Sequence, residues 1–317
     1  MNLGTIPAGM AINRPTVAQL RAFSALAEHL HFRDAAAALR MSQPALSAAV
    51  AALEESLGTR LVERTTRRVL LTPAGERVAR RAEVVLAELD RLVDDVRAVQ
   101  GPLVGQLRVG VIPTVAPYLL PVVLPRVAKE FPSLELSVRE EKTGHIVAEL
   151  LAGRLDVVLL ALPVATAGVT ELVLYDEDFA LVAPAGFQVE DEVSREALND
   201  LDVILLNEGH CLRDQALDVC RDVGARAAAT YATSLATLVQ LVAGGLGVTL
   251  VPETALEVET RRAPDLRVHR FAAPAPFRRI GLGFRSTSPR AHEFEVLAAS
   301  IREAVADSGV APGVRTA

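Results

Sequence analysis

The spacing of hydrophobic residues changes character about one third of the way along the chain of 317 residues. In the first part, apolar side chains recur every three or four positions, which is the spacing of amphipathic helices. Two short apolar stretches, 61–64 and 69–72, are instead predicted to be strands on either side of a turn. The predicted helices are residues 17–30, residues 33–39, the stretch from Ser42 to about 57, and residues 74–98.

Beyond residue 105, short apolar runs alternate with amphipathic segments. Such alternation predicts an α/β fold with mostly parallel sheets. About 210 residues take part, enough for two Rossmann-like lobes as in periplasmic binding proteins, with a cleft where small ligands bind. The predicted strands are 107–111, 134–138, 157–160, 179–183, 203–206, 248–251, 266–271 and 280–284. The predicted helices are 117–130, 144–153, 195–200, one from about 213, 234–243 and 290–306.

These patterns divide the chain into regions. The apolar stripe of residues 74–100 is longer than a lone solvated helix needs, so pairing with a second copy is favoured over docking on its own domain. Within the regulatory domain we expect lobe I over about 103–175 and 276–317, and lobe II over about 176–275. The expected regions are a flexible extension (1–16), an otherwise all-α winged helix-turn-helix domain (17–73), a linker and dimerisation helix (74–100) and a two-lobed regulatory domain (101–317).

The helix-turn-helix carries candidate DNA contacts. Ser42 is a predicted N-cap, and Pro44 is tolerated in a first helical turn. The N-terminal end of such a recognition helix enters the major groove, where Ser42 and Gln43 can bond base edges or phosphates. The turn at 65–68 is a predicted wing, and its Arg67 and Arg68 suit contact with the DNA backbone or minor groove.

Positive charge is concentrated in the predicted DNA-binding region. The chain has a net charge of −6, but residues 1–100 hold 13 arginines against 11 acidic residues. Residues 60–81 hold seven arginines and two glutamates, which favours phosphate contact over the alternative of an ordinary solvated face. Two cysteines cannot form a disulfide framework, no secretory signal is visible, and the uncharged stretch 227–252 is too polar to span a membrane. We therefore expect a cytoplasmic protein without membrane contact.

Cys211 and Cys220 are the only cysteines, and His210 and Arg213 flank the first. Cationic neighbours favour the thiolate that oxidants attack, and a second thiol can trap the product as a disulfide. If a helix begins near Arg213, its N-terminus favours an anion at Cys211. Such a helix holds the cysteines about 13 Å apart, whereas a disulfide needs Cα atoms within about 7 Å. The pattern suggests a redox switch that requires unwinding; the alternative is two inert core cysteines.

The order of these regions resembles that of the LysR-type transcriptional regulators, and residues 32–75 resemble the DNA-binding signature of that family throughout. Residues 209–220 are similar to the redox segment of the peroxide-sensing OxyR-like subfamily. So are residues 112–121 and the Glu140–Thr143 stretch. This resemblance covers nearly all of the chain after residue 16.

The resemblance implies roles for particular residues. Cys211 corresponds to the peroxide-reactive thiol and Cys220 to its resolving partner. The residues expected at the peroxide pocket are Thr114, Thr143, His210, Arg213, Asp214 and Arg285. The residues expected to contact DNA are Arg33, Ser42, Gln43, Pro44, Ser47, Arg64, Arg67 and Arg68.

The resemblance also implies partners: operator DNA, hydrogen peroxide, RNA polymerase and further copies of the chain, as a homodimer or homotetramer. Neither a cofactor nor a metal is expected, since His210 has no second His or Cys at ligand spacing apart from the two thiols themselves. No enzymatic activity is expected. Three alternatives stay open. They are a LysR-type regulator that binds a metabolite in the cleft, a thiol peroxidase, and a solute-binding protein, which the DNA-binding half disfavours.

Overall fold

The computed structural model describes residues 14–64, 69–97, 102–187, 192–199, 201–261, 263, 265–309 and 313–316. Apart from its last three residues, the expected extension over 1–16 lies outside these ranges, as does the expected wing tip with Arg67 and Arg68. The chain forms two compact units, Met1–Val93 and Asp94–Ala317.

In the first unit, three helices pack around one small apolar core. Ser42 caps the third helix as predicted, because its Oγ accepts a hydrogen bond 3.3 Å long from the N–H of Ala45. Gly58 ends that helix in the left-handed region, with φ of 63°. The helices are α1 (Val17–His29), α2 (Phe32–Ala38) and α3 (Gln43–Leu57). Their shared core includes Phe23, Leu26, Leu46, Val50 and Leu53.

A short hairpin follows the three helices. Strands β1 (Val62–Arg64) and β2 (Val69–Leu71) pair antiparallel, with Val62 opposite Leu71. The long helix α4 (Pro73–Arg97) comes next and confirms the helix predicted there. Three of its large apolar side chains are exposed: Val84, Val85 and Leu92.

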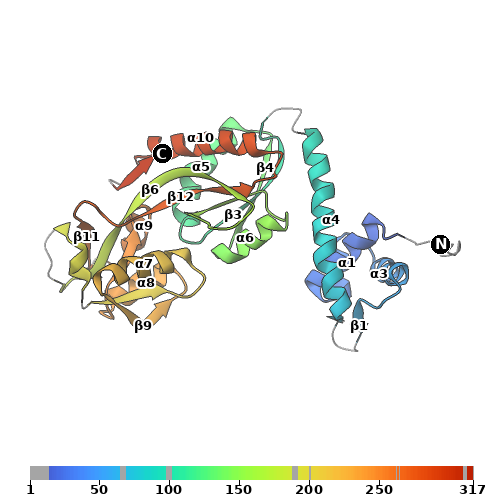
Figure 1. The fold of residues 1–317 in the computed structure, drawn as a ribbon, viewed down its shortest axis with the longest axis horizontal. Helices are drawn as coiled ribbons and strands as arrows, with labels where there is room; N and C mark the ends of the chain where they lie inside the picture. The colour runs from blue at the N-terminus through green and yellow to red at the C-terminus, as the bar shows by residue number, and fades with distance from the viewer. Residues whose placement is uncertain are drawn as a thin grey trace, which may run out of the picture. The chain divides into compact units, whose positions relative to one another are not determined.

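The second unit is built on a mixed sheet of nine described strands (Figure 1). Their order is β4-β3-β5-β12-β6-β11-β7, and β10 and β13 also pair with β6. Strands β8 (Asp202–Leu206) and β9 (Arg226–Ala232) form a separate parallel pair. The strands of the sheet are β3 (Gly105–Val111), β4 (Leu134–Glu140), β5 (Val157–Leu162), β6 (Val169–Pro184), β7 (Glu192–Val193), β10 (Thr249–Pro252), β11 (Leu266–Phe271), β12 (Phe277–Arg285) and β13 (Val314–Thr316).

Helices cover this sheet and the smaller pair. In Figure 1, α5 and α10 lie side by side on one face of the sheet, and α6 lies on the other face. The helices are α5 (Ala116–Glu130), α6 (Thr143–Leu151), the 3-10 turn η2 (Arg195–Leu198), α7 (Cys211–Val223), α8 (Leu235–Ala243), α9 (Glu253–Thr260) and α10 (Ala291–Asp307). Among the described residues, no helix has both the length and the apolar character needed to cross a bilayer.

Two separate hydrophobic cores give this unit two lobes, which confirms the predicted two-lobed α/β architecture. The core of lobe I includes Leu107, Val111, Leu160, Ile280 and Phe294. The core of lobe II includes Phe179, Leu181, Ile204, Val239 and Leu250. The long strand β6 contributes to both, since Leu174 lies in the first core and Leu181 in the second.

The expectation of mostly parallel sheets is wrong. Strand β6 pairs antiparallel with β10, β11, β12 and β13. The physical reason is the path of the chain, which enters lobe II along β6 and returns to lobe I along β12. Two neighbouring strands that carry the chain out and back must run in opposite directions.

Candidate functional site

Both cysteines lie in α7, which begins earlier than predicted. Cys211 is its first residue and His210 its N-cap, so the expected start near Arg213 is two residues too late. Gly209, with φ of 90°, makes the turn that leads from β8 into the helix. The helix ends at Gly224, whose φ is 75°.

The two cysteines belong to different faces of this helix. Leu212, Ala216 and Cys220 recur every four residues and are buried in the core of lobe II. Cys220 is 2% exposed, and burial raises the pKa of its thiol to about 11. Cys211 is only partly buried, and neither cysteine forms a disulfide.

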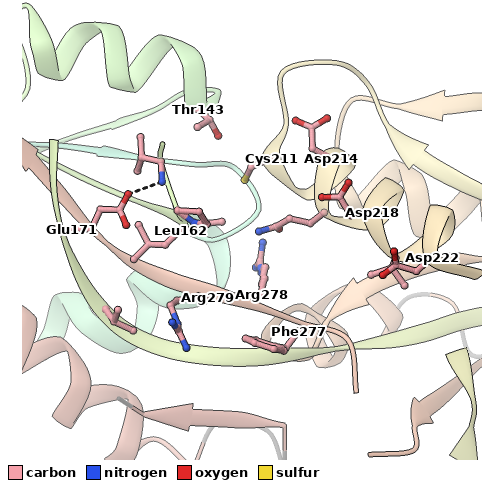
Figure 2. A pocket seen from close by; sticks show the side chains of 16 residues that line it. Thr143, Leu162, Glu171, Cys211, Asp214, Asp218, Asp222, Phe277, Arg278 and Arg279 are labelled. Atoms are coloured by element: carbon pink, nitrogen blue, oxygen red, sulfur yellow. Dashed lines mark hydrogen bonds between the residues drawn. The ribbon is translucent and has the colours of Figure 1, made fainter. Parts of the chain in front are cut away.

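Cys211 faces a cavity of about 780 Å³ between the two lobes (Figure 2). Thr143, at the start of α6, lines the cavity from lobe I, and Asp214 lines it from α7. The Oγ1 of Thr143 is buried and has no hydrogen-bond partner among the described residues. The structure therefore brings Cys211, Thr143 and Asp214 together, as the sequence led us to expect. Other lining residues include Leu162, Glu171, Gln215, Asp218, Asp222, Phe277, Arg278 and Arg279.

Arg278 is a buried cation of this cavity wall. Its Nε donates a hydrogen bond of 2.8 Å to Oε1 of Glu177, and both side chains are 0% exposed. Its Nη1 donates to Oγ1 of Thr114 at 3.0 Å, and its Nη2 donates to the carbonyl of Thr114 at 2.9 Å. The other carboxylate oxygen of Glu177 accepts a bond of 2.6 Å from the hydroxyl of Thr254. Thr114 thus reaches the site through Arg278, and its hydroxyl keeps its own proton to donate.

The sequence prediction missed Arg278, although a signal for it was present. The predicted strand began at residue 280, whereas β12 begins at Phe277. Extending the two-residue period backwards from Leu282 and Ile280 places Arg278 on the same face as those buried side chains. An arginine on the core face of a strand needs a buried partner, which here is Glu177.

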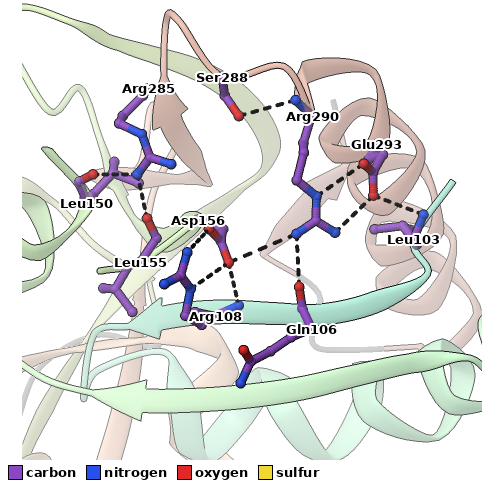
Figure 3. A network of polar contacts seen from close by, with 10 residues as sticks. All are labelled: Leu103, Gln106, Arg108, Leu150, Leu155, Asp156, Arg285, Ser288, Arg290 and Glu293. Carbon is purple, nitrogen blue, oxygen red and sulfur yellow. Dashed lines mark hydrogen bonds and ion pairs between the residues drawn. The ribbon is translucent and has the colours of Figure 1, made fainter. Parts of the chain in front are cut away.

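The expected placement of Arg285 and Arg213 beside the thiol requires correction. Nη1 of Arg285 donates to the carbonyls of Leu150 and Leu155, each at 2.5 Å (Figure 3). Arg285 and Arg278 lie seven positions apart along β12, a span of about 23 Å. Nη1 of Arg213 donates to the carbonyl of Leu206 at 3.1 Å, in a separate hollow. Two helical residues turn a side chain by about 200°, so Arg213 and Cys211 point to opposite sides of α7.

His210 lies next to the thiol but is not among the residues that line the cavity. It is buried, and its Nε2 has no hydrogen-bond partner among the described residues. Burial lowers the pKa of His210, and the nearby positive charge of Lys142 lowers it further, so the imidazole is held neutral. No group of three His, Cys, Asp or Glu side chains suited to a metal ion occurs within the described ranges.

The predicted DNA-contacting residues of the first unit lie at the surface where they can be placed. Ser42, Gln43 and Pro44 are exposed at the start of α3, and Ser47 is partly exposed one turn later. Arg33 is exposed on α2. Arg64 ends β1, but its side chain lies outside the described part, as do Arg67 and Arg68.

A helix-turn-helix unit and a two-lobed unit with a thiol in its cleft together define a DNA-binding regulator. The chain belongs to the LysR family, in its OxyR-like group. Residues 17–76 match the model of the bacterial regulatory helix-turn-helix protein, lysR family, and residues 100–306 match the LysR substrate binding domain.

Individual relatives match over nearly the whole length. A probable hydrogen peroxide-inducible genes activator of Streptomyces viridosporus is 59% identical over 93% of this chain and 96% of its own. The structure of a Corynebacterium glutamicum OxyR cysteine mutant with hydrogen peroxide bound is 43% identical, with a TM-score of 0.65, over 93% of this chain and 94% of that one. A full-length OxyR cysteine variant from Pseudomonas aeruginosa is 34% identical, with a TM-score of 0.75, over 95% and 98% of the two chains.

Proposed function

We propose that this chain is a transcriptional regulator that senses hydrogen peroxide through Cys211 and stores the signal as a Cys211–Cys220 disulfide. The observation that carries the proposal is the placement of the two thiols. Cys211 faces an open cavity, while Cys220 lies buried on another face of the same helix. The peroxide-related names of the relatives support the same conclusion.

The proposed chemistry has two steps. The Cys211 thiolate attacks one oxygen of hydrogen peroxide, the O–O bond breaks, and Cys211 becomes a sulfenic acid as hydroxide leaves. The Cys220 thiol then attacks the Cys211 sulfur, forming the disulfide and releasing water. Overall, two thiols are oxidised while one peroxide is reduced to two waters, so each chain reacts once until a dithiol restores it.

Two hydroxyl groups, that of Thr143 in the cavity wall and that of Thr114 bonded to Arg278, suit the departure of hydroxide. The buried Oγ1 of Thr143 has no partner among the described residues, so its proton is available to peroxide. The hydroxyl of Thr114 accepts from Arg278, which leaves its proton free to donate. We assign Asp214 to the cavity wall, and His210, held neutral, to packing behind the thiol.

The remaining parts of the proposal concern partners. The start of α3 binds operator DNA through Ser42, Gln43, Pro44 and Ser47, aided by Arg33 and by arginines 64, 67 and 68. Copies of the chain pair through the exposed apolar residues of α4 into a homodimer or homotetramer. The regulator works in the cytoplasm, acts with RNA polymerase on antioxidant genes, and is not an enzyme.

One observation favours a second candidate. A cavity of about 780 Å³ is far larger than a peroxide molecule and is within the range of small-molecule sites. The second candidate is therefore a regulator that answers to a metabolite in this cavity, with the cysteines as bystanders.

Operator footprinting and transcription in vitro, with and without stoichiometric peroxide, separate these functions. The first proposal expects peroxide to change the footprint of the unmodified protein and to leave that of Cys211→Ser unchanged. Cys220→Ser tests the second step, because it should form the sulfenic acid without a stable switch. A full peroxide response in Cys211→Ser would overturn the proposal. Steady consumption of peroxide with a dithiol, together with an operator footprint that peroxide leaves unchanged, would instead indicate a thiol peroxidase.

A further inference from the structure

Lys142 connects the two lobes directly beside the segment that carries Cys211. It is the N-cap of α6 in lobe I, where its side chain makes no capping hydrogen bond. That side chain instead crosses to lobe II, and its Nζ donates a hydrogen bond of 2.8 Å to the carbonyl of Glu208. Glu208 lies in the turn between β8 and α7, three residues before Cys211. Lobe I thereby holds the turn from which the reactive thiol emerges.

The stem of Lys142 also packs against this turn. A Cβ atom built on Gly209 would lie 3.0 Å from Cδ of Lys142 and 3.8 Å from its Nζ. The contact at 3.0 Å is tight, so a side chain at Gly209 would displace the lysine stem by a few tenths of an ångström. The absence of a side chain at Gly209 therefore serves two purposes, since the residue also adopts a φ of 90°.

The positive charge of the Lys142 ammonium group also affects this turn electrostatically. Its charge contributes, after burial, to lowering the pKa of His210, the last residue of this turn before Cys211. Thr143, which follows Lys142 in the sequence, lines the cavity that Cys211 faces. One short connection in lobe I therefore provides both a hydroxyl for the cavity and a cation that holds the opposite wall.

We propose that Lys142 is a positioning residue that clamps the Glu208–His210 turn onto lobe I in the reduced protein. This inference rests on the proposed function, since it concerns the Cys211–Cys220 couple. The disulfide requires the first turns of α7 to unwind, and residues 208–210 are continuous with them. The bond from Lys142 to Glu208 must therefore break or shift when the disulfide forms, so it stabilises the dithiol form selectively.

The size of the effect follows from the exposure of the contact. The bond from Lys142 to Glu208 is exposed, and such a hydrogen bond from a charged donor typically changes an equilibrium by about three- to tenfold. Loss of the clamp should therefore shift the dithiol–disulfide equilibrium toward the disulfide by about three- to tenfold. For a two-electron couple this lowers the midpoint potential by about 14–30 mV.

The test compares the midpoint potentials of the full-length protein and its Lys142 variants in glutathione redox buffers. Lys142→Met removes the charge and all donors, whereas Lys142→Arg keeps both. The chain has one other lysine, Lys129 on α5, which is exposed, so Lys129→Met is a matched control for the loss of one lysine charge. We expect a lower potential in Lys142→Met, restoration toward the original value in Lys142→Arg, and no change in Lys129→Met.

A second measurement separates the clamp from the first chemical step. In a Cys220→Ser background, dimedone trapping reports the rate of sulfenic acid formation without any disulfide. In Lys142→Met with both cysteines present, the later closure step should accelerate by about the same three- to tenfold factor. An unchanged potential in Lys142→Met, or an equal shift in Lys129→Met, overturns the role of Lys142 alone. If the unmodified protein forms no Cys211–Cys220 disulfide with peroxide, the proposed function fails and this inference fails with it.

Discussion

Cys211 and Cys220 share one helix, yet each faces a different environment. Cys211 opens α7 and faces the cavity between the lobes, whereas Cys220 lies nine residues on and is buried in the core of lobe II. Nine residues of helix span about 13 Å, whereas a disulfide needs Cα atoms within about 7 Å. The intact helix therefore keeps the two thiols apart, and any bond between them requires α7 to unwind.

The first prediction concerns the unequal reactivity of the two thiols. In the folded protein near neutral pH, iodoacetamide should modify Cys211 and spare Cys220, because Cys220 is buried and its pKa is raised to about 11. Mass analysis of tryptic peptides after a short exposure measures the ratio. In denaturing urea the two should react equally, and equal rates in the native protein would contradict the buried position of Cys220.

The raised pKa of Cys220 should also make the free energy of unfolding decrease at alkaline pH. The folded state holds this proton more tightly than the unfolded state, whose thiol has the ordinary value of 9.0. The resulting stability is fully present below pH 9.0 and is lost as the pH rises through about 11. Urea unfolding of Cys220→Ala across this range should lack that alkaline component.

The second prediction compares the two arginines. Arg278→Lys cannot bond Glu177 and Thr114 together, since lysine lacks the fork of the guanidinium group. We expect the peroxide step to slow by about ten- to a hundredfold, as when a donor to a leaving oxygen is misplaced. The matched variant Arg285→Lys should react at nearly the original rate, because Arg285 bonds the carbonyls of Leu150 and Leu155 instead.

Dimedone trapping in a Cys220→Ser background measures both rates directly. A slow Arg285→Lys together with a normal Arg278→Lys would show that the arginine assignment is reversed.

The third prediction follows from the lowered pKa of His210. The folded state resists protonation of this buried imidazole, while the unfolded state takes up a proton near the ordinary value of 6.5. The free energy of unfolding should therefore be insensitive to this group above pH 6.5 and should decrease as the pH falls from there through the folded pKa. Urea unfolding between about pH 5 and pH 7.5 should show a weaker dependence in His210→Gln. An unchanged dependence would place the titrating group elsewhere.

The fourth prediction separates base contacts from phosphate contacts. Gln43→Ala, at the exposed start of α3, should weaken operator binding by about 1–3 kcal/mol and leave binding to unrelated DNA almost unchanged. Arg33→Ala should instead weaken binding to both DNAs and reduce the salt slope by about one unit. Fluorescence anisotropy over a salt series measures both quantities. If Gln43→Ala loses affinity equally for both DNAs, a contact of Gln43 with a base is contradicted.

The sequence was most informative where local chemistry decides structure. The cap at Ser42, the stop at Gly58 and the helical spacing between them predicted α3 almost to the residue. The unexpected strand β9 (Arg226–Ala232) and helix α9 (Glu253–Thr260) lie in stretches without a clear apolar period. Periodicity is a weak guide for such segments, because tertiary neighbours decide their conformation.

The site shows the same division between local and distant information. Cys211 could be singled out from its cationic neighbours, whereas Thr143 and Asp214 were expected at the site because of the resemblance to the OxyR-like subfamily. The bond from Arg278 to Thr114 joins residues 164 positions apart, and no local pattern specifies such a pair. Arg285 was expected near the thiol because residues 281–285 resemble a family segment, and only the fold shows that Arg278, at the other end of β12, meets the cavity.

Unwinding of α7 is measured best by hydrogen–deuterium exchange, combined with a non-reducing peptide map before and after stoichiometric peroxide. A switch by unwinding should give a Cys211–Cys220 crosslink and a loss of amide protection over Cys211–Val223, and a dithiol should reverse both. Cys220→Ser should keep its protection after the same treatment. A crosslink that forms while α7 stays fully protected, or thiols that remain free, would contradict a switch based on unwinding.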